Sequence, residues 1–184
     1  SKLVSSQIPH GAPIVRPAAF PGQIDHEVEL AVLIGQPLKN ASAAEAEAAI
    51  AGFTVANDVT HRGLQSEAKA AGRPWTLAKG LPTFGPIGPW VVADTVESLR
   101  GRAIACHVDD ALRQTGTLDE MTHGVTETLA FLSTLGGLEP GDQVWMGTPA
   151  GVGPLEAGQR VRCEIEGIGA LQNPIINERA LGND

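Results

Sequence analysis

Residues 27–34 read Glu-Val-Glu-Leu-Ala-Val-Leu-Ile and are followed by Gly35. Successive side chains of a β-strand point to opposite faces, so Glu27 and Glu29 lie on the same face. The rest of that face is small or apolar, and the opposite face is wholly apolar. Because a strand that is apolar on both faces is buried on both, the segment predicts a central strand whose two carboxylates point into the protein.

Two carboxylates that lie side by side away from water cannot both stay ionised without a compensating positive charge. Either one of them is protonated or a cation is bound; an ordinary solvent-facing pair is the alternative. Asp58 follows the apolar run 53–56, which places it at a strand end beside the core, although it could instead cap a helix that begins near residue 60. Three carboxylates without a cysteine or histidine partner favour a hard cation, namely Mg²⁺, Mn²⁺ or Ca²⁺.

Length and composition predict one folded domain. A chain of 184 residues can bury a core of its own, and its 22 glycines and 13 prolines indicate many turns between short strands. The net charge of −8, with no cluster of Lys or Arg, argues against nucleic acid as a partner. The longest uncharged apolar run, residues 30–35, is far shorter than the roughly 20 residues of a membrane helix, and no signal-peptide pattern opens the chain.

The two cysteines, Cys106 and Cys163, each lie in an alternating, strand-like run. Two widely spaced cysteines in such positions favour reduced, buried thiols over a disulfide framework or a zinc site. We therefore expect a cytoplasmic protein in which both thiols are structural.

The remaining pattern predicts more strands than helices. Helices are expected at 43–52, where Ser42 and Glu45 form a capping box, at 60–71, and within 121–135. Further strands are expected at 53–57, 90–92, 103–108, 143–146 and 161–165. Strands and helices do not alternate, so the fold class is α+β with a mixed, mostly antiparallel sheet.

The motifs of this chain resemble those of the fumarylacetoacetate hydrolase family. The resemblance keeps its order over nearly the whole chain and rests on the following segments: 25–35, 57–65, 75–79, 112–114, 138–142, 147–149, 151–155, 166–169 and 173–174. It implies the β-roll or barrel-like fold of that family, with short helices, and a single catalytic domain over residues 1–184.

The resemblance also implies roles for individual side chains. Glu27, Glu29 and Asp58 match the family's metal ligands, which usually bind Mg²⁺ or Mn²⁺. The matches to residues of the substrate pocket are Arg62, Gln65, Lys79 and Thr148, and we expect Lys79 and Gln65 to act in catalysis. On the expected helix, Arg62 and Gln65 are three residues apart and share one face.

The chain departs from the family pattern at three places. Gly63 replaces a common Asp, and Asp109-Asp110 replace a common Asn-Gly, which indicates an altered hairpin turn. Relatives also carry an upstream segment whose histidine activates water, and this domain is expected to lack it. None of the five histidines matches that base, and only His61 lies beside a proposed ligand.

The implied activity is the metal-dependent hydrolysis of a carbon–carbon bond in an acylpyruvate such as fumarylpyruvate, which gives pyruvate and a carboxylic acid. A metal ion that polarises the oxygens of a 2-oxo acid would also suit an oxaloacetate-type decarboxylase or an isomerase of 2-hydroxy-diene-dioates, so these two activities remain alternatives. A metal-binding member with little activity is a further alternative. The resemblance finally implies a homodimer and a place in the catabolism of aromatic compounds.

Overall fold

The computed structural model describes residues 2–89 and 91–178. The strands are β1 (Gln7–Ile8), β2 (Ile14–Arg16), β3 (Ile24–His26), β4 (Val28–Ile34), β5 (Ile50–Asn57), β6 (Thr60–His61), β7 (Gly85–Pro86), β8 (Ala103–Val108), β9 (Ala111–Thr117), β10 (Gln143–Trp145), β11 (Gly153–Pro154), β12 (Arg160–Ile165) and β13 (Gly169–Asn177). The α-helices are α1 (Ala43–Ala48), α2 (Arg62–Ala70), α3 (Thr76–Lys79) and α4 (Val125–Leu135). Short 3₁₀ turns lie at Val4–Ser6, Glu97–Leu99 and Leu118–Glu120.

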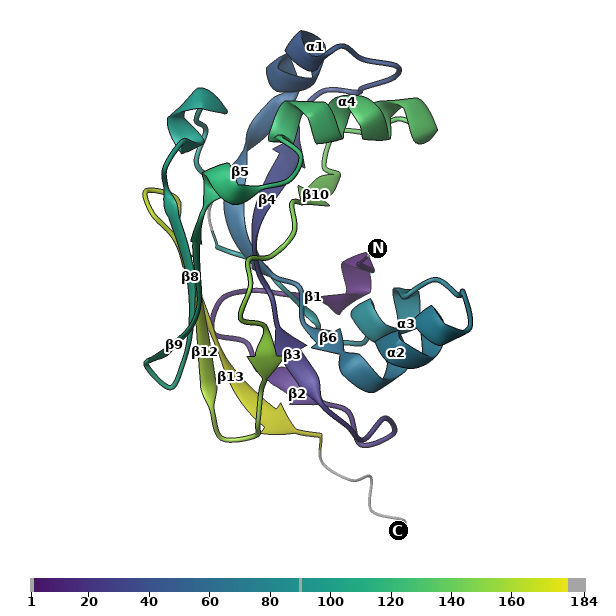
Figure 1. Ribbon diagram of the computed structural model, residues 1–184, viewed down its shortest axis with the longest axis vertical. Helices are drawn as coiled ribbons and strands as arrows, with labels where there is room; N and C mark the ends of the chain where they lie inside the picture. The colour runs from purple at the N-terminus through teal and green to yellow at the C-terminus, as the bar shows by residue number, and fades with distance from the viewer. Residues whose placement is uncertain (1, 90, 179–184) are drawn as a thin grey trace.

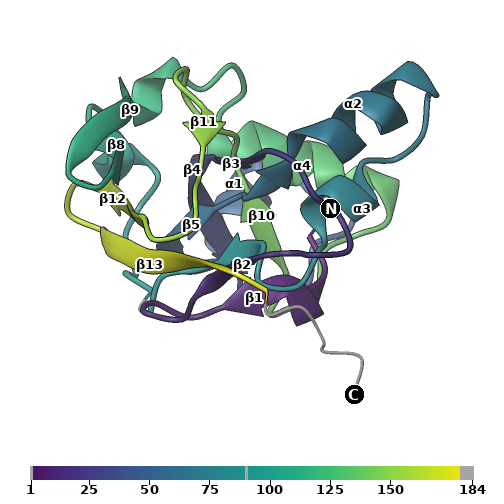
Figure 2. The same cartoon turned by 90° about the horizontal axis from the view of Figure 1, so that it is seen from below.

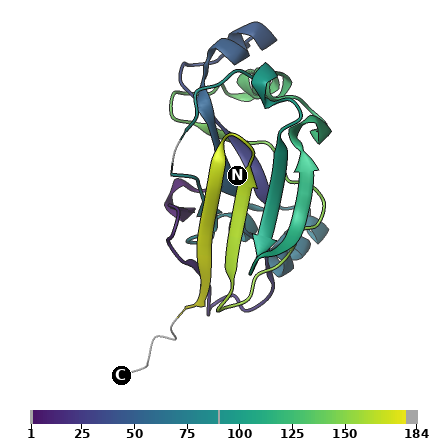
Figure 3. The ribbon, with the colours of Figure 1, turned by 90° about the vertical axis from the view of Figure 1, so that its left-hand side faces the viewer.

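The strands form two layers that face each other (Figure 1). One layer is a five-stranded sheet in the order β2-β13-β12-β8-β9, seen face-on in Figure 3. The other combines two three-stranded sheets, β10-β4-β5 and β11-β3-β6. The strand pairs are antiparallel except for β1–β7 and β13–β2. The expected mixed, mostly antiparallel α+β fold is therefore confirmed.

A buried apolar cluster joins the two layers. It includes Val55 of β5, Val161 of β12 and Leu171 of β13, each at most 1% exposed. Fully burying such a side chain contributes about 1.5–3 kcal/mol, so this cluster is the main source of stability. Helices α1 and α4 lie together at one end of the layers, and α2 and α3 lie beside β3 and β6, on the side away from the five-stranded sheet (Figures 1 and 2).

Helices α1 and α2 have boundaries that differ from the sequence-based expectation. Helix α1 has the expected capping box but ends at Ala48, because residues 50–52 pair with β4 instead. At Gly52 a Cβ atom would lie 2.2 Å from Val91 Cγ1, so the strand passes closer to its neighbour than alanine would allow. Helix α2 begins at Arg62, since Thr60 and His61 pair with β3.

The prediction of a strand at 90–92 is wrong for residues 91 and 92, which the structure describes. Val92 forms only an isolated bridge with Phe53, and Trp90 lies outside the described residues. The helix expected within 121–135 is confirmed from Val125 onward. Asp109 and Asp110 form the tight turn between β8 and β9, with φ of 48° and 66°. No helix in the described ranges is long and apolar enough to cross a membrane.

Candidate metal centre

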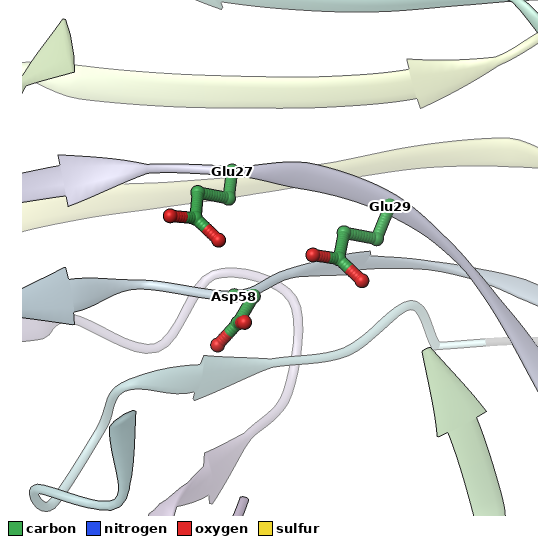
Figure 4. Close-up of side chains that lie close together, drawn as sticks. All are labelled: Glu27, Glu29 and Asp58. Carbon is green, nitrogen blue, oxygen red and sulfur yellow. The ribbon is translucent and has the colours of Figure 1, made fainter. Parts of the chain in front are cut away.

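Glu27, Glu29 and Asp58 meet where β4 begins and β5 ends. Glu27 lies between β3 and β4, and its backbone N–H donates to the Asn57 side chain at 2.9 Å. The backbone N–H of Asp58 donates to the Glu27 carbonyl at 2.8 Å, which brings the end of β5 against the start of β4. One carboxylate oxygen from each of the three acids lies within 4.8 Å of the others (Figure 4). The structure thus brings all three expected ligands together.

Two lysines neutralise part of this cluster. Lys79 Nζ lies 2.7 Å from Glu27 Oε2 and 2.6 Å from Asp58 Oδ2. Burial opposes its charge, but Asp58 and Glu27 outweigh burial and raise the pKa of Lys79 above its usual value. Lys2 Nζ lies 2.8 Å from Asp58 Oδ1, and burial lowers the pKa of Lys2 to about 8 despite that partner.

Glu29 is the carboxylate that these lysines do not neutralise. It is 4% exposed and accepts the backbone N–H of Gly147 at 2.8 Å. In the described ranges it has no ion-pair partner. Burial, followed by the nearby charge of Asp58, raises the pKa of Glu29 to about 8. A buried carboxylate that lacks a counter-charge, beside two further carboxylates, fits a hard divalent cation.

Arg62 contacts the carboxylate cluster but does not line the cavity into which the cluster opens. Its Nη2 is 2.6 Å from Glu27 Oε1, and its Nε is 2.6 Å from Asp25 Oδ2. Its Nη1 donates to Gln65 Oε1 at 2.8 Å, so the expected shared face of Arg62 and Gln65 on α2 is present. Arg62 therefore holds Glu27 in place, and Gln65 holds Arg62. Gln65, like Arg62, does not line that cavity.

The carboxylate cluster opens into a cavity of about 820 Å³. Besides the three acids, its wall includes Lys2, Lys79, Trp75, Trp145 and Thr148. A second cavity of about 450 Å³ is also lined by Gly147 and Thr148. Thr148, one of the expected substrate-binding residues, thus lies at the boundary between a charged cavity and a neighbouring one.

Lys2 and Trp145 contribute to this cavity but were not expected from the sequence. Lys2 Nζ also donates to the carbonyl oxygens of Val59 and Phe84 and lies 6.0 Å from the centre of the Trp145 ring. A lone lysine next to the first residue belongs to no periodic pattern. Its position depends on contacts that span more than 50 residues, and no local signal reveals them.

The histidines near the cluster have structural partners. His61 is the N-cap of α2: its Nδ1 accepts the Leu64 N–H at 3.2 Å, and its Nε2 lies 3.1 Å from the Phe20 carbonyl. The alternative in which Asp58 caps this helix is therefore wrong. His26 points to the opposite face of its strand from Glu27 and lies 2.7 Å from Gln114 Oε1. Cys106 and Cys163 are both buried and free, as expected.

Comparison with known proteins identifies related sequences and structures. The family model described as "Fumarylacetoacetate (FAA) hydrolase C-terminal" matches residues 1–176. The mitochondrial oxaloacetate decarboxylase of Dictyostelium discoideum is 35% identical over 167 residues, which cover 91% of this chain and 77% of that protein.

Two solved structures are also similar. The fumarylpyruvate hydrolase of Pseudomonas aeruginosa, solved with Mn²⁺ and pyruvate, has a TM-score of 0.90 and 34% identity over 96% of this chain and 77% of its own. The 5-carboxymethyl-2-hydroxymuconate delta-isomerase of Mycobacterium smegmatis has a TM-score of 0.87 and 36% identity over 96% of this chain and 67% of its own. This chain belongs to the fumarylacetoacetate hydrolase family.

Proposed function

We propose that this protein is a divalent-metal-dependent enzyme that hydrolyses a carbon–carbon bond of an acylpyruvate, such as fumarylpyruvate, to pyruvate and a carboxylic acid. The observation that carries the proposal is the group of three carboxylates, with Glu29 lacking a counter-charge, at the wall of an 820 Å³ cavity. The similar fumarylpyruvate hydrolase, which binds Mn²⁺ and pyruvate, supports the choice of reaction.

Glu27, Glu29 and Asp58 would hold the cation, for which we propose Mg²⁺ or Mn²⁺, with Ca²⁺ also compatible with oxygen ligands. When bound, the ion would supply a Lewis acid that polarises the oxygens of a 2-oxo acid. The donor set fits this task because all three side chains are hard oxygen ligands and two of them are buried.

Lys79 is the side chain best placed to stabilise negative charge on the substrate. Its ammonium group lies between Glu27 and Asp58, lines the cavity and is kept protonated by both carboxylates. A single well-placed donor to a developing oxyanion contributes about 3 kcal/mol to catalysis. We propose that Arg62 and Gln65 support substrate binding and catalysis through Glu27, which Arg62 contacts directly.

Two other reactions use the same arrangement. Loss of CO₂ from oxaloacetate and the shift of a double bond in a 2-hydroxy-diene-dioate both place negative charge on an oxygen of a 2-oxo acid, as hydrolysis does. The Dictyostelium decarboxylase favours the first and the Mycobacterium isomerase favours the second. A metal-binding protein with little activity is the remaining alternative.

A substrate panel distinguishes these reactions. Protein loaded with Mg²⁺ or Mn²⁺ is incubated with acetylpyruvate, fumarylpyruvate, oxaloacetate and a 2-hydroxy-diene-dioate, and pyruvate, CO₂ and the ultraviolet absorbance of the enol are followed. Pyruvate release from the two acylpyruvates, without CO₂, is the expected result. CO₂ release from oxaloacetate alone would favour the decarboxylase, and absorbance change without cleavage the isomerase. No reaction with any of the four substrates would contradict the proposal that the protein acts on 2-oxo acids.

Metal dependence is tested with two glutamate variants. Glu29→Gln should lose binding of Mn²⁺ and activity together, because it removes an oxygen ligand while keeping the size of the side chain. Glu47→Gln on the exposed surface of α1 is the matched control and should behave like the wild type. Equal Mn²⁺ affinity in wild type and Glu29→Gln would overturn the assignment of the site.

We also propose that the protein is a cytoplasmic homodimer. Exposed apolar side chains on α4, with Phe131 62% and Leu135 69% exposed, support an interface between copies, and the two free thiols support a reducing compartment. Sedimentation velocity at micromolar concentration tests the dimer, and a single species with the mass of one chain would contradict it.

A further inference from the structure

Gln114 on β9 is a fully buried amide that joins three parts of the site. Its Oε1 accepts the backbone N–H of Val28 at 3.2 Å and lies 2.7 Å from His26 Nδ1. Its Nε2 donates to Thr148 Oγ1 and to the Pro149 carbonyl, both at 2.8 Å. Every hydrogen-bonding position that the amide commonly uses is therefore filled.

Two backbone groups fix the direction of this amide. The Val28 N–H is only a donor, so it must face the oxygen of Gln114; the Pro149 carbonyl is only an acceptor, so it must face the nitrogen. The other two contacts then follow. His26 carries its hydrogen on Nδ1, and the oxygen of Thr148 accepts a hydrogen from Gln114.

The direction of the amide determines what the Thr148 hydroxyl can do. A hydroxyl has one hydrogen, and since the Thr148 oxygen accepts from Gln114, that hydrogen must point elsewhere. Within residues 2–89 and 91–178, the Thr148 hydroxyl accepts from Gln114 and donates no hydrogen bond. Thr148 is half-buried at the wall of the cavity that contains the carboxylate cluster. Its hydrogen is thus available to an oxygen of a molecule bound in that cavity.

The same amide also ties the turn to the metal-binding strand. Val28 stands between Glu27 and Glu29, and the turn that carries Thr148 begins at Gly147, whose N–H donates to Glu29. A bound molecule that contacts both the carboxylate cluster and Thr148 therefore meets two groups whose spacing Gln114 fixes.

We propose that Gln114 is a positioning residue that makes Thr148 a dedicated hydrogen-bond donor to the carboxylate of a bound 2-oxo acid. The proposal rests on the proposed function, since it names the group that recognises the substrate's carboxylate. It also explains why a glutamine lies in a wholly buried position of β9: the side chain needs both a donor end and an acceptor end, and an apolar residue supplies neither.

A double-mutant cycle on pyruvate binding tests the proposal. The dissociation constant of pyruvate is measured by calorimetry with Mn²⁺-loaded wild type, Gln114→Met, Thr148→Val and the double variant. We expect each single variant to weaken binding about tenfold or more, as for a lost hydrogen bond to a charged group. The double variant should bind no more weakly than Thr148→Val alone, because Gln114 acts through Thr148. Thr148→Ser, which keeps the hydroxyl, should bind like the wild type.

Folding and metal binding are controlled separately. Thermal unfolding and Mn²⁺ titration accompany every variant, and Gln172→Met, on another strand of the same sheet, is the matched substitution away from the site. If Gln114→Met does not fold, Gln114→Glu replaces it: an ionised carboxylate has no hydrogen, and a protonated one has a single hydrogen for both the Thr148 oxygen and the Pro149 carbonyl, so pyruvate binding should again fall.

The outcomes separate the two claims. Wild-type protein that binds Mn²⁺ but not pyruvate would contradict the proposed function and this inference together. Pyruvate binding by the wild type with independent, multiplicative losses in the cycle, or with no loss in Gln114→Met, would overturn the inference and leave the proposed function standing.

Discussion

The backbone N–H of Gly147 donates to the carboxylate of Glu29 at 2.8 Å, across 118 positions of sequence. It is one neutral hydrogen bond for a carboxylate that is 4% exposed, and it does not offset the cost of burying the charge. The pKa of Glu29 accordingly rises to about 8. At neutral pH the metal-free protein therefore holds a proton where a cation would bind.

Metal affinity should depend on pH through this proton. Below pH 8, binding of Mn²⁺ has to displace a proton from Glu29, so the apparent affinity should rise about tenfold for each pH unit up to that value and level off above it. Titration of Mn²⁺ into chelator-treated protein at pH 6, 7, 8 and 9 measures the slope. An affinity that does not change across this range would show that Glu29 is ionised in the metal-free protein.

The stability of the metal-free protein should change with pH in the opposite direction. The pKa of Glu29 is raised from 4.5 to about 8 on folding, so the folded state binds more protons than the unfolded state between these values. The contribution of Glu29 to the free energy of unfolding is complete below pH 4.5 and is lost as pH rises towards 8. In the presence of chelator, the unfolding temperature of Glu29→Gln should fall less steeply from pH 5 to pH 8 than that of the wild type. Parallel dependence of the two unfolding temperatures on pH would refute this.

The strand β4 and the two carboxylates at its start could be predicted because local pattern and long-range structure agree there. A segment that is apolar on both faces has to be central, and the period of two places Glu27 and Glu29 together wherever the strand lies. The end of the run 53–56 likewise placed Asp58 at the end of β5. The pairing of β4 with β5 then brings the three acids together.

The parts that were missed depend on distant partners. Residues 50–52 follow an alanine-rich run that favours a helix, but pairing with β4 places them in a strand. Gln114 belongs to the family-like segment 112–114, but no local pattern in that segment indicates what its side chain contacts. It becomes important only because Val28, His26 and Thr148 converge on its amide from other parts of the chain. Lys2 could not be predicted for the same reason, because its contacts are with distant residues such as Asp58 and Val59.

Removing Lys79 should destabilise the metal-free protein more than the metal-bound protein. Lys79→Met leaves Glu27 and Asp58 without the ammonium group that contacts both, and loss of one partner of a buried ion pair costs about 3–5 kcal/mol. A bound divalent cation would supply the missing charge. We expect a lower unfolding temperature in chelator, a larger rise on addition of Mn²⁺ than in the wild type, and loss of activity. An equal rise in both proteins would contradict the predicted metal position.

The two thiols should be protected in the folded protein. Cys106 and Cys163 face each other on β8 and β12, with their sulfur atoms 3.9 Å apart and each side chain at most 1% exposed. Reaction with a coloured thiol reagent should therefore detect neither in the native protein and both in guanidinium chloride. Rapid reaction of one thiol before unfolding would show that the sheet opens at this point.

The β8–β9 turn offers a substitution that should stabilise the protein. Asp109 and Asp110 have φ of 48° and 66°, and a two-residue hairpin turn with positive φ at both positions favours Asn-Gly. Asp110→Gly removes the strain of a side chain in this conformation, and we expect a gain of about 0.5–1 kcal/mol in the free energy of unfolding, measured in urea. Asp109 is the matched negative control, because its carboxylate accepts the backbone N–H of Arg160 at 2.9 Å. Asp109→Gly should therefore gain less than Asp110→Gly or lose stability, and the reverse order would show that side-chain bonding does not determine the energetics of this turn.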